Sequence, residues 1–437
     1  MSDLTKMADA MTAISAWMAD GAERLADAAE ALRAAPDPTP DPIPDPTPDP
    51  QPLTDYSNLP VVTIDIAASA AAGKLQTTPT HYSYHPDGCV IQVPDGAGDI
   101  VASQWSVRIH PNTTPNGINP GATFVIRGPG RLVADGGKQL LDLSNHMSED
   151  VRFVIQDMVL SGPVGSRTPK TLVISYTCRV TLERCTLENG YDSLFTATNP
   201  IDLDAIDCII RHGAGTGDGH GHNVYLGYNR NVRFIRCDIS APKAQGHVLK
   251  CYAQHMELRG CTLSHYDTDE DLANGFYGQL PILDRGAWGS TVAVGNTFIR
   301  RGPSDVRRQM IELRNREYPV GYSQYVDAGW GTVPVDPALV DNTDDANEYL
   351  FRHLFYNNVF IDEISDGRGV ILRNNGTTPD GVVIPEQQER CVAYMVGNTY
   401  DGALADQKFE RNPYQRPDLT TPIRELDTLP AWAEALV

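Results

Sequence analysis

The chain has no long hydrophobic run and no leader-like start. No stretch reaches the roughly 18 apolar residues that a membrane-spanning helix needs. No basic segment followed by an apolar run opens the sequence, so we expect no secretory signal peptide. We therefore expect the protein to be made in a reducing cytoplasm, where its eight cysteines would be free thiols.

Basic residues are also scarce. The chain carries 35 Lys and Arg against 56 Asp and Glu, a net charge of −21. Such a balance repels phosphate backbones and argues against nucleic-acid binding. What is plentiful is glycine (37) and proline (32). With 437 residues, ample for a large core, this composition favours a turn-rich β architecture over a helical bundle.

The spacing of apolar residues over 1–35 predicts a helix with one apolar seam. Apolar or small residues recur at alternating spacings of three and four, as in a coiled coil. An isolated helix of this kind is marginal in water, so it needs copies of itself or a docking surface; packing on its own domain is the alternative. The expected attachment and oligomerisation residues are Leu4, Met7, Met11, Ile14, Met18, Leu25 and Leu32.

The alternating prolines of residues 36–53 predict a stiff spacer. From Pro36 to Pro52 every second residue is proline, which excludes helix and inner strand. A polyproline II run rises about 3.1 Å per residue, so the spacer spans roughly 50 Å. An anchoring helix is thereby held away from the domain that follows.

Residues 54–400 contain a repeat of alternating apolar residues followed by a Cys, Asn or small residue. No segment of helical period separates the copies, which excludes leucine-rich repeats and βαβ units. We therefore predict an all-β parallel β-helix solenoid, whose stacking buries a continuous core. One position of each coil is expected to form an interior ladder, at Cys185, Cys208, Cys237 and Cys261.

Two interruptions and the tail depart from the repeat. Residues 264–289 and 302–350 are long excursions, and loops on a rigid scaffold are common places for binding and catalysis. Residues 401–437 have lost the repeat and contain four prolines. We expect this tail to form a cap on the open end of the solenoid.

Two stretches carry a resemblance to a known family. The segment 222–227 (HNVYLG), followed by 246–253 (GHVLKCYA), resembles consecutive rungs of bacterial and phage right-handed parallel β-helix proteins of the pectate-lyase-like superfamily. Asn296 fits the asparagine often placed at the turn of a later rung in that family. The resemblance implies a right-handed parallel β-helix over about residues 120–400.

The whole layout also resembles the tailspikes of phages and the head spikes of gene transfer agents. That resemblance implies a homotrimer on the surface of a phage-like particle, made in the bacterial cytoplasm. It would bind capsular polysaccharide and hold a capsid or tail protein through its N-terminal helix, with no cofactor or metal and no membrane insertion. A polysaccharide lyase or hydrolase on the same solenoid and a structural decoration protein are the alternatives.

A histidine cluster is the first candidate site. It comprises His212, Asp218, His220, His222 and His247. His220 and His222 share a face if their segment is extended, and His247 and Lys250 come one rung later. Polar stacking, a metal site, and glycan binding or acid–base chemistry are the three interpretations.

An acidic cluster is the second candidate site. It comprises Asp267, Asp269, Glu270 and Asp271, followed by Asp284 and Arg285. Glycoside hydrolysis needs two carboxyl groups roughly 5–10 Å apart, for which Asp267 or Asp269 would pair with Asp284 or Glu312. For lysis, Lys250 or His247 would be the base and Arg285 the carboxylate partner. A solvated acidic loop is the alternative.

Aromatic and basic residues in the excursions are the third candidate. Sugar rings pack on flat aromatic surfaces, and guanidinium groups bind carboxylates. The arginines of the region are Arg300, Arg301, Arg307, Arg308, Arg314 and Arg316. Including the histidines, the predicted glycan-binding residues are His220, His222, Trp288, Arg314, Tyr318, Tyr322, Tyr325 and Trp330. Packing of the aromatic residues onto the solenoid or a neighbouring subunit is the alternative.

Overall fold

A computed structural model of the chain describes residues 55–437, except for the segments 73–74, 103–104, 107–117, 135–138, 144–150, 163–169, 175–177, 197–201, 214–220, 228, 244–245, 287–288, 304–308, 315–339, 342–349, 365–368, 376–390, 403–408 and 412–422. The chain divides into units at Leu53 and Thr54, and only the second unit contains described residues. The predicted helix at 1–35, with its attachment residues from Leu4 to Leu32, and the spacer at 36–53 lie outside them. Within the described part, no helix is long and apolar enough to cross a membrane.

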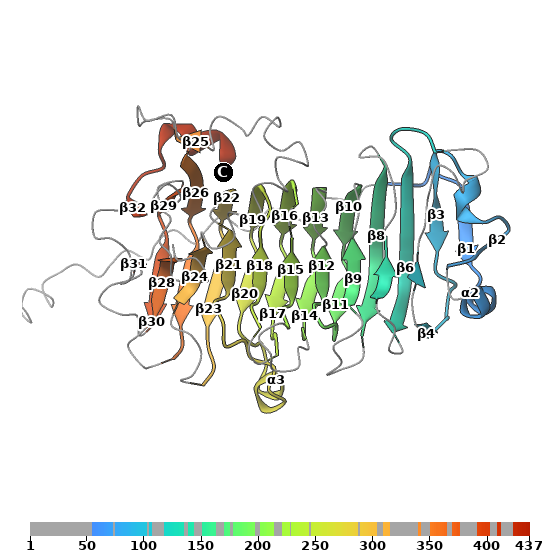
Figure 1. Cartoon of the computed structure of the whole chain (residues 1–437), viewed down its shortest axis with the longest axis horizontal. Helices are drawn as coiled ribbons and strands as arrows, with labels where there is room; N and C mark the ends of the chain where they lie inside the picture. The colour runs from blue at the N-terminus through green and yellow to red at the C-terminus, as the bar shows by residue number, and fades with distance from the viewer. Residues whose placement is uncertain are drawn as a thin grey trace, which may run out of the picture. The chain divides into compact units, whose positions relative to one another are not determined.

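The described residues form an all-β, solenoid-like fold made of two sheets (Figure 1). We call the 22-stranded sheet the long sheet and the 10-stranded sheet the short sheet. Their strands pair in parallel, apart from the antiparallel pairs β1–β2 and β25–β26 among those described. Figure 1 shows the strands following one another in chain order along the stack.

The long sheet begins with β1 (Val61–Ile64), β2 (Thr77–Thr78), β3 (Gly88–Gln92), β4 (Asp99–Ala102), β6 (Thr123–Ala134), β8 (Arg152–Ser161), β10 (Arg179–Glu183), β11 (Thr186–Glu188), β13 (Asp202–Ile206), β14 (Ile209–Arg211), β16 (Asn231–Ile235) and β17 (Asp238–Ser240). It continues with β19 (His255–Arg259), β20 (Thr262–Ser264), β22 (Ser290–Val294), β23 (Thr297–Arg300), β25 (Val340–Asp341), β26 (Leu350–Tyr356), β27 (Val359–Asp362), β29 (Cys391–Val396), β30 (Thr399–Gly402) and β32 (Ile423–Leu426).

The short sheet consists of β5 (Trp105–Ser106), β7 (Gln139–Asp142), β9 (Lys170–Ile174), β12 (Leu194–Thr196), β15 (Val224–Leu226), β18 (Leu249–Cys251), β21 (Leu283–Gly286), β24 (Gln309–Arg314), β28 (Val370–Asn375) and β31 (Phe409–Arg411). Each coil of the chain thus adds strands to both sheets: β13 and β14 join the long sheet, β15 joins the short one, and β16 to β18 repeat the sequence. This is why the apolar pattern recurs along the sequence.

The core lies between the sheets and is built from columns of like residues. One column of the short sheet is in register from strand to strand and is fully buried: Leu194, Val224, Leu249, Leu283, Ile311 and Leu372. Because parallel strands lie about 4.8 Å apart, equivalent side chains stack directly on one another. Phe298 and Phe360 stack in the same way, with ring centroids 5.0 Å apart.

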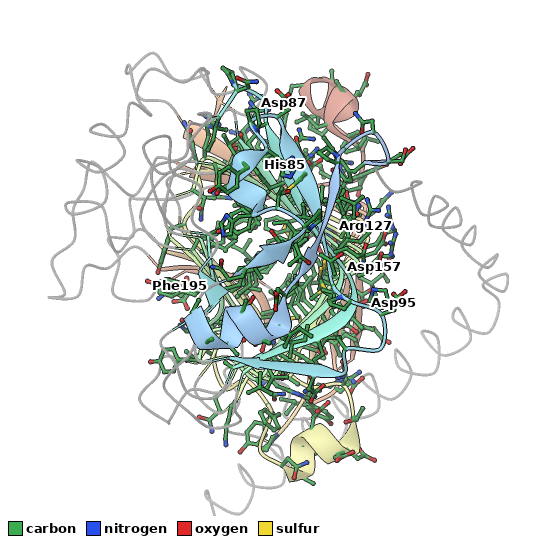
Figure 2. The ribbon with its side chains drawn as sticks, turned by 90° about the vertical axis from the view of Figure 1, so that its right-hand side faces the viewer. His85, Asp87, Asp95, Arg127, Asp157 and Phe195 are labelled. Atoms are coloured by element: carbon green, nitrogen blue, oxygen red, sulfur yellow. The ribbon has the colours of Figure 1, made fainter. Side chains whose placement is uncertain are left out.

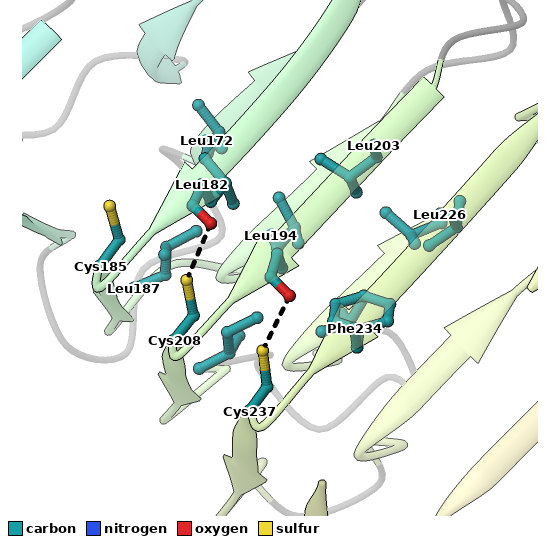
Figure 3. Packing of buried hydrophobic residues seen from close by; sticks show 14 of the residues in the cluster. Leu172, Leu182, Cys185, Leu187, Leu194, Leu203, Cys208, Leu226, Phe234 and Cys237 are labelled. Atoms are coloured by element: carbon teal, nitrogen blue, oxygen red, sulfur yellow. Dashed lines mark hydrogen bonds between the residues drawn. The ribbon is translucent and has the colours of Figure 1, made fainter. Parts of the chain in front are cut away.

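The predicted cysteine ladder is confirmed. The four cysteines lie at equivalent corners of successive coils, buried and free, and Figure 3 shows three of them in line. Each thiol donates a hydrogen bond to a carbonyl of the preceding coil: Cys208 to Leu182 at 3.6 Å, Cys237 to Ala205 at 3.2 Å and Cys261 to Phe234 at 3.3 Å. The thiols therefore satisfy corner carbonyls, and burial raises the pKa of Cys185 and Cys237.

Asparagine continues this ladder after Cys261. The Asn296 Oδ1 accepts from the amide of Cys261 at 2.9 Å, and its Nδ2 donates to the Leu258 carbonyl at 3.1 Å. Asn358 and Asn398 repeat both kinds of contact in the next coils. A side-chain amide both donates and accepts, so it links neighbouring coils more completely than a thiol does.

The residue before each ladder position has a positive φ. Glycine fills this place before Cys261, Asn296 and Asn398, where a Cβ would strain the backbone. Charged residues fill it in earlier coils, at Asp157, Arg184, Asp207 and Arg236. There Arg184 pairs with Asp157, and Arg236 pairs with Asp207 at 2.7 Å, so ion pairs link these corners on the surface.

Short helices lie at the edges of the stack. Helix α2 (Ile66–Ala72) lies across its N-terminal end (Figure 2). Helix α3 (Asp269–Ala273) projects from one side in Figure 1 and begins with a capping box between Thr268 and Asp271. The short 3-10 helix η1 (Tyr82–Tyr84) precedes β3.

The expectation that the repeat ends near residue 400 is wrong. Strand β31 pairs in parallel with β28, and β32 pairs in parallel with β29. The 3-10 helix η5 (Ala431–Leu436) then packs on the outward face of the long sheet, where Ala433 joins an apolar cluster with Val292 and Tyr394. The tail folds back far enough for Arg259 to donate to the Leu436 carbonyl at 2.7 Å, beside β22 in Figure 1.

Candidate functional site

Polar residues of the short sheet form one outward-facing column. Tyr225, Lys250, Asp284 and Glu312 are in register on β15, β18, β21 and β24. Their neighbours along each strand point into the core, so alternation directs this column away from it. Asp284 and Glu312 are nevertheless fully buried. We call these four residues the short-sheet column.

Two histidines flank this column. The Nε2 of His247 lies 3.3 Å from the Oδ2 of Asp284. His222 Nδ1 accepts from the His247 amide at 3.0 Å and lies 3.2 Å from the His247 Nδ1. Since His222 Nδ1 acts as an acceptor, the proton between the rings belongs on His247 Nδ1. His222, His247 and Asp284 are therefore buried next to one another beside the column.

Aromatic rings surround the Lys250 ammonium group. Its Nζ lies 4.6 Å from the centroid of the Tyr225 ring and 5.3 Å from that of Tyr252. Phe195 extends the aromatic surface, 5.7 Å from Tyr225. In Figure 2 Phe195 lies on the opposite side of the stack from Arg127 and Asp157. Cation–π contacts of this kind hold the ammonium group against the aromatic rings.

This arrangement has the parts of an acid–base site. Asp284 and Glu312 occupy neighbouring parallel strands, about 4.8 Å apart at the backbone. Two carboxyl groups and a histidine are the kinds of group that acid–base catalysis of glycoside hydrolysis uses. Because His247 and both acids are buried, a substrate reaches them only if the surrounding side chains move.

The structure places the other predicted acids elsewhere. Asp267 accepts hydrogen bonds from Ser240 at 2.6 Å and Ser264 at 3.0 Å, next to the long sheet. Asp269 is the exposed first residue of α3. Asp267 therefore bonds to strands of the long sheet and fastens the loop that carries α3, whereas Asp284 contacts His247.

His212 and the first two arginines of the basic segment have structural partners. His212 Nε2 lies 2.7 Å from Asp271, whose carboxyl also caps α3. Arg300 is fully buried and pairs with Asp362 at 2.8 Å, and Arg301 pairs with Glu363 at 2.7 Å. These contacts link coils to one another and leave the two arginines engaged rather than open to a glycan.

Most predicted glycan-binding residues lie outside the described residues. They are His220, Trp288, Tyr318, Tyr322, Tyr325 and Trp330. The side chains of Arg285 and Arg314 lie outside them as well. Of that predicted set, the structure describes only the side chain of His222.

A groove that was not predicted from the sequence lies on the outward face of the long sheet. It has a volume of about 330 Å³ and crosses β8, β10, β13, β16 and β19. We call it the long-sheet groove; its lining residues are Arg152, Arg179, Val180, Thr181, Asp202, Asp204, Asn231, Arg233 and His255. The signal was present in the sequence, because the first two outward positions of four neighbouring strands (RVTLE, DLDAI, NVRFI, HMELR) carry charged or polar residues.

Ion pairs organise the charges of this groove. Asp202 accepts from Arg230 at 2.9 and 2.7 Å and from Asn231 at 2.9 Å. Burial alone would raise the pKa of Asp202, but these hydrogen bonds outweigh it and lower the pKa. Asp204 holds Arg233 in the same two-pronged way at 2.6 and 2.8 Å, which raises the pKa of that arginine. Both aspartates are therefore engaged by neighbouring arginines.

The described ranges contain no group of three or more His, Cys, Asp or Glu side chains arranged to hold a metal ion. In comparisons with known proteins, no protein-family model, no curated protein and no solved structure matches the chain.

Proposed function

We propose that the chain is a spike subunit that attaches a phage-like particle to bacterial surface polysaccharide. In this proposal the stacked coils are a right-handed parallel β-helix. The N-terminal helix assembles a homotrimer and docks on a capsid or tail protein, and the proline-rich spacer sets the reach. The observation that supports binding best is the long-sheet groove.

The groove suits a polysaccharide in length and chemistry. Five strands about 4.8 Å apart give a run of about 19 Å along the stack. Sugar hydroxyls donate and accept hydrogen bonds, and the groove offers guanidinium donors, carboxylate acceptors and an amide. Three copies in a trimer would turn weak contacts into useful avidity.

Retention of capsular polysaccharides by the full-length protein tests this proposal. The double variant Asp204→Ala/Arg233→Ala removes both members of one groove ion pair and leaves no unpaired charge behind. We expect it to bind roughly tenfold more weakly, the effect of losing a few charge-assisted hydrogen bonds. The matched control Arg301→Ala/Glu363→Ala removes an ion pair outside the groove and should bind like the wild type. The proposal fails if the wild type retains no polysaccharide from a broad panel, or if the groove variant binds with undiminished affinity.

Polysaccharide cleavage is a second candidate function, favoured by the contact between His247 and Asp284 and by Glu312 in register beside them. Hydrolysis would release reducing ends alone, whereas lysis would also add the absorbance of an unsaturated uronate. We expect Asp284→Asn and Glu312→Gln to abolish either signal in folded protein. Persistent cleavage in both variants, or no cleavage by the wild type, would remove this candidate.

A further inference from the structure

Two arginines of the long-sheet groove lie directly beside each other. Arg152 opens β8 and Arg179 opens β10, and their Cα atoms are partners in the parallel ladder. Both side chains are exposed, that of Arg179 by one half. Their backbones are about 4.8 Å apart, and like charges placed opposite each other on neighbouring strands destabilise a sheet. The pair gains stability when an anion lies between the guanidinium groups.

The nearby carboxylates supply that anion only in part, through a long ion pair between Asp202 and Arg179. Asp202 is engaged by Arg230 and Asn231, and its Oδ2 lies 3.6 Å from the Arg179 Nε, beyond hydrogen-bond distance. Asp204 is engaged by Arg233. Among the described residues no carboxylate pairs with Arg152.

Other arginines on this sheet face acids of a neighbouring coil. Arg184 faces Asp157, Arg233 faces Asp204, and Arg236 faces Asp207. Arg179 faces Asp202 in the same way but at the longer distance of 3.6 Å. Arg152 lies beside Arg179 at the end of the groove and pairs with no acid among the described residues. Three arginines and two aspartates line the groove, so it has a formal charge of 3 − 2 = +1 on a chain of net charge −21.

We propose that Arg152 and Arg179 bind the carboxylate of an acidic sugar, so that the polysaccharide recognised in the groove is a uronic-acid type polymer. This inference rests on the proposed function. A planar carboxylate accepts two parallel hydrogen bonds from a guanidinium group, and its two oxygens let it bridge both arginines. The engaged pairs at Asp202 and Asp204 would then contact hydroxyls of neighbouring sugars.

Calorimetry with the full-length protein tests the inference. The probes are acidic capsular polysaccharides, oligogalacturonate, the carboxyl-reduced form of each, neutral capsular polysaccharides and dextran sulfate. We expect the wild type to prefer an acidic polymer over its carboxyl-reduced form roughly tenfold, as expected for a charge-assisted contact. Arg152→Gln/Arg179→Gln should lose that preference and bind the acidic polymer and its reduced form with equal affinity. Arg131→Gln/Arg301→Gln, with the same change in charge away from the groove, should keep it.

Each other outcome has a definite meaning. Equal binding of acidic and reduced polymers, binding of neutral polymers alone, or a preference that survives in the Arg152→Gln/Arg179→Gln variant, overturns the carboxylate inference and leaves polysaccharide binding standing. A preference for dextran sulfate over every uronate also overturns it. If the wild type binds none of the polymers, the proposed function itself fails.

Discussion

At the scale of single residues, the corner ladder shows how side-chain chemistry fixes the stack. Cysteine and asparagine occupy the same corner, but they satisfy different numbers of backbone groups. The thiol of Cys208 has a single hydrogen to donate, with the Leu182 carbonyl at 3.6 Å and the Ile206 carbonyl at 3.3 Å. The amide of Asn358 accepts from the Asn296 amide at 2.9 Å and donates to the Ala293 carbonyl at 3.0 Å. The asparagine positions of the ladder therefore contribute more to the stability of the fold than the cysteine positions do.

Substitution of these corners should show that difference. Asn358→Ala leaves buried donors and acceptors unsatisfied, so we expect it to lower the free energy of unfolding by about 3 kcal/mol. Cys208→Ala removes a smaller, weakly bonded group and should cost about 1 kcal/mol. Urea unfolding followed by circular dichroism measures both. Equal costs for the two substitutions would contradict the account of the ladder.

His265 predicts a dependence of stability on pH. Burial lowers its pKa from the usual 6.5 to about 4. Its neutral ring places Nε2 at 3.0 Å from the Leu280 carbonyl and accepts from the Arg301 amide at Nδ1 at 3.4 Å. Between pH 4 and 6.5 the unfolded chain binds the extra proton, so stability rises with pH through this window. It falls by about 3 kcal/mol as the pH drops from 6.5 to 4.

Comparison with His265→Gln isolates this contribution, because glutamine does not titrate. The difference in unfolding free energy between wild type and variant should favour the wild type most at pH 7 and shrink as the pH approaches 4. A difference that stays constant from pH 4 to 7 would show that His265 is not the titrating group.

At the scale of elements, the C-terminal segment covers an apolar patch of the long sheet. Trp432 in η5 packs edge-on against Tyr394, with centroids 5.1 Å apart, and the Arg352 guanidinium lies 4.3 Å from the Trp432 ring centroid. Val292 and Val396 lie in the same cluster. Folding back in this way hides apolar side chains that an outward sheet face would otherwise expose.

Removal of the indole ring should release this segment. We expect Trp432→Ala to lower the free energy of unfolding by about 2 kcal/mol, since the ring is only partly buried. Amide exchange should rise across η5 and β32 but not in β10 or β13. Trp432→Phe, which keeps an aromatic ring, should retain most of the protection. Unchanged exchange in Trp432→Ala would show that the segment is held by other contacts.

The strands were more predictable from the sequence than the sites. Alternating apolar residues fixed the strands around each cysteine, because each coil returns to the same core position. The acidic cluster was misleading, since Asp267 and Asp271 serve the loop that carries α3 rather than a partner on the short sheet. The tail was misjudged because its prolines obscured β31 and β32. Which outward residues meet depends on register between distant coils, and local sequence does not encode that register directly.

At the scale of the whole molecule, the proposal separates attachment from recognition. The chain divides at Leu53 and Thr54, and the groove lies entirely in the second unit. Deletion of residues 1–52 should therefore abolish incorporation into particles and lower the oligomeric mass, while binding per subunit to a short oligosaccharide stays unchanged. Particle counts by immunoblot, light scattering and calorimetry check the three effects. A truncated chain that fails to fold would contradict the separation.

The location of a bound sugar tests the central claim most directly. A cryo-electron microscopy or crystal structure of the full-length protein, saturated with a fragment of a polysaccharide that it retains, would reveal the binding surface. The account predicts sugar density along the long-sheet groove over β8 to β19, with a carboxylate between Arg152 and Arg179. Density on another surface with this groove empty would contradict it.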